Sequence, residues 1–175
     1  QYNGVKFCLG GARPVGADTG LDTVRDTATS VLEGRGPLPA HTPGSVSSHD
    51  LLSDFAGHVV SFLGDGALRP MSVVADTANV PAVFERLPQV SLEIMYGELD
   101  GTFPNHPADP LQPANQRDLQ ARVQAGGFDV GLAFDGDADR VFVVDETGRG
   151  LSGSVTTALL AAGILRTHPG ATILH

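Results

Sequence analysis

The sequence predicts a mixed α/β fold, and three observations lead to this prediction. Strand-like and helix-like segments alternate over residues 72–134, an order typical of parallel strands joined by helices. The segment 129–134 is almost continuously apolar, as in strands of a sheet that is covered on both faces. The chain is 41% hydrophobic over 175 residues, which suffices for a sizeable core.

The first segments predict a short strand and a helix. Residues 5–9 alternate in polarity like a strand, and Cys8 within them is interpreted as a small core residue, because the chain has no second cysteine to pair with it. A helical pattern follows over 21–32 and is ended by Gly34.

The stretch 34–44 is rich in glycine and proline, and we interpret it as a linker between domains. Beyond it, apolar residues recur at helical spacing over 50–63, which predicts an amphipathic helix. Ser47 or Ser48 is the expected N-cap, because a serine hydroxyl accepts a hydrogen bond from a free amide of the first turn.

The alternation that defines the fold begins after this helix. The predicted elements are a strand at 72–75, a helix at 80–87, a strand at 91–96, a helix at 114–125, strands at 129–134 and 141–144, a helix at 154–167 and a strand at 171–174. We expect the strand at 141–144 to run antiparallel to the one before it. Both ends of the chain carry strand patterns that lack a partner, so we expect a piece of a larger protein.

The charge balance excludes a nucleic-acid surface. The formal net charge is -9 and Lys6 is the single lysine, whereas nucleic-acid phosphates require clustered basic residues. Small phosphorylated substrates need only a few local cations and are compatible with an acidic protein. No apolar run is long enough to cross a membrane, and residues 1–4 do not resemble a secretory signal, so we expect a cytoplasmic protein without a membrane partner.

The most informative segment is 133–144, in which Asp135, Asp137 and Asp139 stand between two apolar strands. Carboxylate oxygens suit Mg²⁺, which usually keeps positions open for water or for a substrate phosphate. The glycine after the first aspartate permits a tight backbone path, and Arg140 can bind the same phosphate with its fork of donors. The segment therefore predicts a metal site for phosphoryl transfer.

Two other interpretations of this segment stay open. Asp-x-Asp-x-Asp also begins a calcium-binding EF-hand loop, and Glu146 stands at the twelfth position of such a loop. Arg140, however, stands where that loop needs glycine, and strand patterns rather than helices flank the segment. The second interpretation is a solvated acidic turn, although turns rarely combine three aspartates with an arginine.

Three segments together resemble the α-D-phosphohexomutases, the phosphomannomutase and phosphoglucomutase enzymes of bacteria. Residues 134–140 resemble the metal-binding loop of this family. Residues 101–110 are similar to its F-P-N-H-x-P-x-P loop, and residues 2–6 are similar to the Y-N-G-x-K segment that follows its catalytic serine. The resemblance spans essentially the whole chain, and the order and separation of the segments agree with it.

The resemblance implies a four-domain enzyme built from three-layer α/β domains. Its boundaries on this chain are 1–34 for the end of domain 1, 35–49 for a linker, 50–150 for domain 2 with the metal loop, and 151–175 for the start of domain 3. The implied reaction interconverts hexose 1-phosphate and hexose 6-phosphate of mannose or glucose. It uses a phosphoserine and Mg²⁺, and it passes through a bisphosphorylated hexose.

By position in this resemblance, the three aspartates are the Mg²⁺ ligands and Arg140 steadies the transferring phosphate. Lys6 is the expected general acid and base, although a lysine in an alternating strand otherwise points to solvent. These roles suit phosphoryl transfer, whose spread negative charge is stabilised by a metal and fixed cations. His106 has no carboxylate or second histidine at ligand spacing, so its loop is interpreted as mainly architectural.

The chain departs from the family pattern in two segments. The catalytic serine of the family precedes the segment that residues 2–6 resemble, so we expect that serine before Gln1 and expect this chain by itself to be inactive. After the strand at 72–75 the family usually has a longer glycine-rich turn, whereas here 77–79 leads directly into the next helix. Either this branch has a shorter turn or residues are missing from it, and we favour the second interpretation.

Two other functions stay open beside the mutase. A phosphatase of the haloacid dehalogenase type also uses an acidic loop after a strand, but it needs an aspartyl nucleophile followed at i+2 by an acid and then by threonine or valine. Here Asp139 and Arg140 come at the fourth and fifth positions after Asp135, which favours metal ligands over a nucleophile. The other alternative is a non-catalytic module that binds a metal or a phosphosugar.

Overall fold

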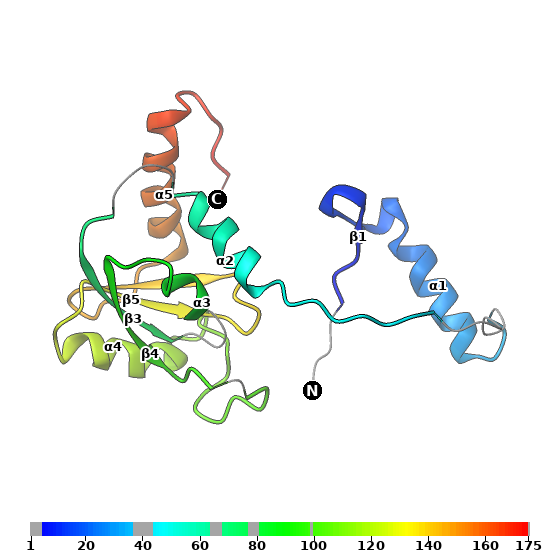
Figure 1. The fold of residues 1–175 in the computed structure, drawn as a ribbon, viewed down its shortest axis with the longest axis horizontal. Helices are drawn as coiled ribbons and strands as arrows, with labels where there is room; N and C mark the ends of the chain where they lie inside the picture. Colours follow the sequence, from blue (N-terminus) through cyan, green and yellow to red (C-terminus); the bar gives the residue numbers. More distant parts are fainter. Residues whose placement is uncertain (1–4, 37–43, 64–67, 77–80, 99, 175) are drawn as a thin grey trace. The chain divides into compact units, whose positions relative to one another are not determined.

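The structure is a computed structural model that describes residues 5–36, 44–63, 68–76, 81–98 and 100–174 (Figure 1). The chain divides into two compact units, Gln1–Ser48 and His49–His175, and each is described by itself. The domain boundaries expected from the sequence stay a prediction. The short turn expected at 77–79 lies outside the described residues.

The first unit is a small hairpin followed by a helix. Its elements in chain order are β1 (Cys8–Leu9), η1 (Gly10–Ala12), β2 (Arg13–Pro14), η2 (Ala17–Thr19) and α1 (Leu21–Leu32). β1 and β2 pair antiparallel. The predicted strand over 5–9 is therefore only two residues long, because the glycine-rich turn η1 reverses the chain at once. The interpretation of Cys8 as a core residue is wrong, since it is exposed in this structure.

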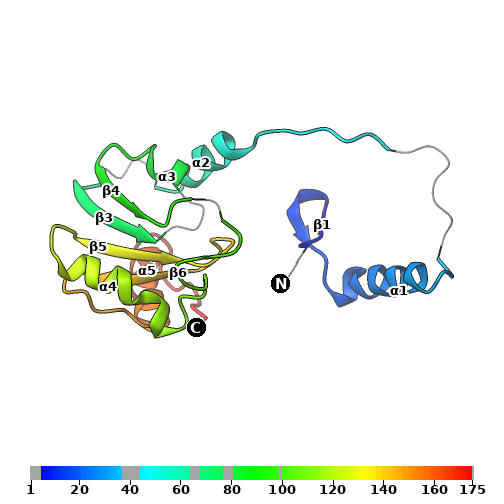
Figure 2. The ribbon, with the colours of Figure 1, turned by 90° about the horizontal axis from the view of Figure 1, so that it is seen from below.

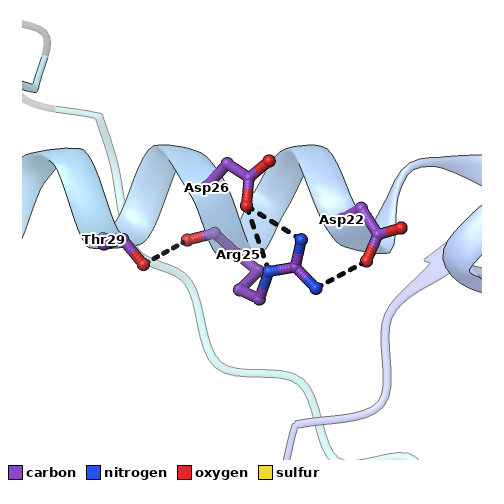
Figure 3. A network of polar contacts seen from close by, with 4 residues as sticks. All are labelled: Asp22, Arg25, Asp26 and Thr29. Atoms are coloured by element: carbon purple, nitrogen blue, oxygen red, sulfur yellow. Dashed lines mark hydrogen bonds and ion pairs between the residues drawn. The ribbon is translucent and has the colours of Figure 1, made fainter.

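Helix α1 has the bounds that its pattern predicts. Gly34, just past its end, has a φ of 72°, in the left-handed region where glycine commonly terminates helices. On the surface of α1, Arg25 donates hydrogen bonds to Asp22 at 2.9 Å and to Asp26 at 3.0 Å, and the Thr29 hydroxyl donates to the Arg25 carbonyl at 3.0 Å (Figure 3). Such exposed pairs contribute about 0.3–0.5 kcal/mol each, so this network supports the helix and forms no site.

The second unit contains the sheet. Its elements are α2 (Leu52–Ser61), β3 (Met71–Asp76), α3 (Pro81–Phe84), β4 (Val90–Met95), η3 (Pro113–Gln116), α4 (Arg117–Gln124), β5 (Val130–Phe134), β6 (Val141–Asp145) and α5 (Gly153–Thr167). The strand order is β4-β3-β5-β6. β3 runs parallel to β4 and β5, whereas β6 runs antiparallel to β5 (Figure 2). The predicted mixed α/β fold and the antiparallel return of β6 are confirmed.

Helix α4 packs on one face of the sheet and encloses most of the core. The buried cluster consists of Val74, Leu119, Val123, Ala133 and Val144. β5 contributes a glycine at position 131 because a Cβ there would lie 2.8 Å from the Val123 side chain. Only glycine therefore lets α4 approach β5 this closely.

The opposite face of the sheet is covered by α2 and α3, so the unit has three layers. Figure 1 shows α2 and α4 on opposite sides of the sheet. Val73 and Ala75 of β3 point away from α4 and are buried, as is Ala56 of α2. Phe84 of α3 meets Phe134 of β5 edge to face, with ring centroids 6.5 Å apart. The covered faces agree with the apolar character of the central strands.

The details of several predicted elements differ in the structure. The predicted serine N-cap of α2 is wrong, because the helix begins after Leu51 and the Asp50 carboxylate accepts the amide of Leu52 at 2.9 Å. The helix expected over 114–125 opens with the 3-10 turn η3. Residues 171–174, where the sequence predicts a strand without a partner in this chain, have no regular secondary structure.

The C-terminal helix α5 contacts β6 and begins at a serine cap. The Ser152 hydroxyl accepts a hydrogen bond from the Val155 amide at 3.3 Å. Among the described residues, no helix is both long enough and apolar enough to cross a membrane.

Candidate metal centre

Three aspartates converge in the loop that joins β5 to β6. Asp135, Asp137 and Asp139 each offer a carboxylate oxygen, and these oxygens lie within 4.8 Å of one another. The loop leaves β5 at its carboxyl end, the edge at which the parallel strands β3 and β4 also end. Ligand sites of α/β sheets commonly lie at this edge.

The backbone of the loop explains why alternate carboxylates share one side. Ala138 has a φ of 56°, a left-handed conformation that non-glycine residues rarely adopt. Its amide donates to the Asp135 carbonyl at 3.1 Å, which closes a tight turn. The Asp135 amide in turn donates to the Arg140 carbonyl at 3.3 Å, so the loop is closed at its base.

Asp135 is the buried member of the three, with 1% of its surface exposed. Its carboxylate accepts a hydrogen bond from Nε of Arg140 at 2.6 Å and a second from the Arg140 amide at 3.1 Å. This bonding with Asp135 raises the pKa of Arg140 above its usual value. The Asp135 carboxylate is therefore held in place by a permanent cation.

The donor set fits a hard divalent cation. Three carboxylates supply oxygen ligands, two of them exposed, and such a set suits Mg²⁺ with some positions left to water or phosphate. The EF-hand interpretation does not hold, because strands β5 and β6 flank the loop where that motif requires helices.

A cavity of about 530 Å³ lies at the same edge of the sheet, at the ends of β3 and β4. Its lining includes Asp76, Tyr96, Phe103, His106 and Phe134. His106 lies with Nε2 2.7 Å from an Asp76 oxygen. The sequence reasoning on His106 missed this carboxylate, which comes from a strand 30 residues earlier in the chain. An acidic residue at the carboxyl end of a buried strand is the signal that could have identified it.

Lys6 belongs to the first unit, whereas the three aspartates and Arg140 belong to the second. It lies in an exposed segment before β1 that has no regular secondary structure. Within the second unit, the structure brings together Asp135, Asp137, Asp139 and Arg140. The role of Lys6 stays a prediction.

The fold and the loop together define a three-layer α/β domain with an acidic centre suited to a divalent metal. Residues 62–149 match the family model described as phosphoglucomutase/phosphomannomutase, alpha/beta/alpha domain II. The chain belongs to the phosphoglucomutase/phosphomannomutase family. The resemblance noted in its three sequence segments is thereby confirmed.

Similar proteins carry the same family names. A phosphomannomutase of Salmonella montevideo is 34% identical over 100% of this chain and 40% of its own length. A phosphoglucomutase of Neisseria meningitidis serogroup B is 33% identical over 99% of this chain and 37% of its own length. A crystal structure of a phosphoglucomutase/phosphomannomutase family protein from Burkholderia thailandensis has a TM-score of 0.72 and 30% identity, covering 86% of this chain and 33% of that one. The chain thus spans about two fifths of the length of the curated relatives named here.

Proposed function

We propose that this chain is the metal-binding part of a phosphohexomutase that interconverts hexose 1-phosphate and hexose 6-phosphate. The observation that carries the proposal is the convergence of three carboxylates beside Arg140, in the domain that matches the family model. The names of the relatives, phosphomannomutase and phosphoglucomutase, support mannose or glucose phosphates as substrates. The expected domain boundaries and the cytoplasmic location belong to the same proposal.

The chain's own residues hold charge and geometry in this reaction. Asp135, Asp137 and Asp139 hold the Mg²⁺, which when bound stabilises the negative charge of the transferring phosphoryl group. Arg140 is fixed through its Nε to Asp135, and the terminal nitrogens of its guanidinium supply donors to a phosphate oxygen. Lys6 takes and returns the proton of the hexose hydroxyl that gains or loses the phosphoryl group. The phosphoryl donor is a phosphoserine upstream of Gln1.

Two measurements test the proposal. A calorimetric titration of this chain with Mn²⁺ should show one binding site per chain, and added Mg²⁺ should displace the Mn²⁺ from it. In the full-length enzyme, hexose 1-phosphate should be converted to hexose 6-phosphate in the presence of Mg²⁺. Release of inorganic phosphate instead of hexose 6-phosphate would indicate a phosphatase, and metal binding without any turnover would indicate a binding module.

Arg140→Ala separates phosphate binding from metal binding in that enzyme. Loss of a charged donor to a transferring group lowers turnover on the order of a hundredfold or more. Mn²⁺ affinity should fall less, by about tenfold, because Arg140 is an outer partner of the Asp135 carboxylate. Arg25→Ala, which removes an arginine far from the aspartates in sequence, is the matched control. Equal losses of turnover and of metal affinity would contradict the assignment of Arg140 to phosphate.

A further inference from the structure

His106 lies between two oxygen acceptors beside the metal loop. Its Nε2 lies 2.7 Å from Oδ2 of Asp76, and its Nδ1 lies 3.0 Å from the Pro107 carbonyl oxygen. A carbonyl and a carboxylate both require a donor, so both ring nitrogens carry a proton. The Asp76 side chain is only 8% exposed and that of His106 is 19% exposed. The two residues therefore form a largely buried ion pair.

Groups from the neighbouring elements favour the charged form of His106. The Tyr96 ring, which follows β4, meets the imidazole edge to face with centroids 5.4 Å apart. The Tyr96 hydroxyl donates to the Asp118 carboxylate of α4 at 2.8 Å. Burial by itself would lower the pKa of His106, but Pro107, Asp76 and Asp118 together raise it above its usual value.

The partner carboxylate responds to burial in the opposite sense. Burial raises the pKa of Asp76 above its usual value, although the imidazolium of His106 opposes this shift. Two further acids, Glu98 and Asp100, line the cavity that contains the pair. Asp100 accepts hydrogen bonds from the amide and hydroxyl of Thr102, which lowers its pKa and keeps it anionic. The elements around His106 thus all present acidic side chains to it: Asp76 from β3, Asp118 from α4, and Glu98 and Asp100 from the segment after β4.

The loop that carries His106 borders the metal loop. A Cβ added at Gly136 would lie 3.4 Å from Cζ of Phe103 and 3.6 Å from Cβ of Ala108, so both side chains flank this glycine. The charge of Asp109, in the same loop, also contributes to the raised pKa of Arg140. Gly136 stands between the first two aspartates, so residues 101–110 flank the backbone from which the carboxylates extend. Phe103 precedes His106 by three residues and Ala108 follows it by two, so an anchor at His106 restrains both neighbours of Gly136.

We propose that the Asp76–His106 ion pair is a clamp that holds residues 101–110 against Gly136 and so keeps the three aspartates converged. His106 is a positioning residue here, because it acts on the metal through the 101–110 loop. The inference rests on the proposed function in one respect, namely that a divalent metal is the ligand of the aspartates. It assigns to the loop a role in metal affinity that its sequence does not reveal.

The first test measures Mn²⁺ affinity in this chain and in two variants. His106→Ala removes the clamp and should weaken binding about tenfold, the lower end of the effect of losing an outer partner of a metal site. His106→Gln keeps a neutral donor near Asp76 and should weaken Mn²⁺ binding less than His106→Ala does. His49→Gln, an exposed histidine of the same unit, is the control. Unchanged affinity in His106→Ala would overturn the clamp.

The second test needs no metal. Hydrogen exchange of the Ala138 and Arg140 amides reports the closure of the metal loop, and it should become about tenfold faster in His106→Ala. After correction for intrinsic rates, exchange in the wild type should rise as pH passes above the raised pKa of His106. His106→Gln should show no such step. If His106 has a merely structural role, the pH profiles of exchange in wild type and His106→Gln will be alike, and this result would overturn the clamp.

The two tests separate this inference from the proposed function. Failure of the wild-type chain to bind Mn²⁺ would refute the metal site, and the exchange profile would still decide whether His106 holds the loop. Normal Mn²⁺ binding with identical exchange in wild type and His106→Ala would refute the clamp alone.

Discussion

Two buried carboxylates at the same edge of the sheet are each paired with a cation, but they differ in how the pair is made. Asp135 and Arg140 are five residues apart in one loop, and arginine stays charged at any pH the fold survives. Asp76 and His106 are 30 residues apart, and histidine changes charge near neutral pH. One pair is thus local and permanent, whereas the other is assembled by the fold and depends on pH.

The comparison teaches that similar geometry does not imply similar function. Asp135 belongs to a group of three acids whose oxygens converge, and we propose that its charge serves to bind a divalent metal. Asp76 has a single strong partner in the described part of the molecule, and its charge serves to hold a loop. Replacing the aspartate by asparagine in each pair should therefore lower the Mn²⁺ affinity by different amounts.

The largest effect is expected when the Asp135 carboxylate is compared directly with that of Asp76. Asp135→Asn removes a proposed charged ligand from the centre and should lower Mn²⁺ affinity by more than about a hundredfold, beyond what loss of an outer partner costs. Asp76→Asn should lower it by about tenfold at most. Calorimetric titration of both variants checks this, with the exposed Asp54→Asn as control. Equal losses in the first two variants would mean that both acids are ligands.

A second prediction disturbs the packing that supports both pairs. Gly131→Ala forces a methyl group to within 2.8 Å of the Val123 side chain and 3.1 Å of the Val144 side chain. Overpacking of this kind costs about 1–3 kcal/mol of unfolding free energy, measured by urea denaturation followed by circular dichroism.

The matched control is Gly163→Ala in α5, where the added methyl meets only Arg166 at 3.9 Å. Replacing glycine by alanine within a helix should stabilise it by about 0.5–1 kcal/mol. A loss of stability at Gly163 as large as that at Gly131 would show that close approach of α4 is not the cause.

The third prediction uses pH to separate the two pairs. The raised pKa of His106 means that its pair stabilises the fold fully below the pKa of a free histidine, about 6.5, and that this stabilisation is lost as pH rises through the raised value. The raised pKa of Asp76 acts in the same sense, because stability falls as pH rises through the range above about 3.8. Arginine stays charged across both ranges, so Arg140 remains a cation beside Asp135 throughout.

Urea unfolding at pH of about 5.5 and about 8.5 checks this prediction in the wild type and in His106→Gln. The stability difference between them should be larger at the lower pH and should shrink at the higher. A difference that stays constant would mean that folding does not shift the pKa of His106, and a difference that grows with pH would mean that His106 is neutral in the folded protein.

The smallest expected effect concerns an ion pair outside the comparison. Arg25 lies on the surface of α1 with 66% of its side chain exposed, and it contacts Asp22 and Asp26 (Figure 3). Arg25→Ala should reduce helix stability by no more than about 0.5 kcal/mol, observed as a small loss of helical circular dichroism. An effect above about 1 kcal/mol would show that this network does more than support the helix.

The sequence predicted the order of the central elements because their signals are local. Periodicity, glycine stops and the apolar run of β5 depend on neighbouring residues, and these elements appear within a few residues of their expected bounds. The strand pattern at 171–174, for which no partner is expected in this chain, forms no strand among the described residues, because a strand is defined by the segment it pairs with.

The same division applies to the candidate site. By itself, the sequence determined the three aspartates, Arg140 and the family, because a metal loop places its ligands within a few residues of one another. Only the tertiary structure decided that Asp76 meets His106, since the β3–β5 pairing and the return of residues 101–110 bring together groups that are far apart in the chain. Burial, which raises the pKa of Asp76, and the partners that raise the pKa of His106 against burial likewise exist only once the layers have packed.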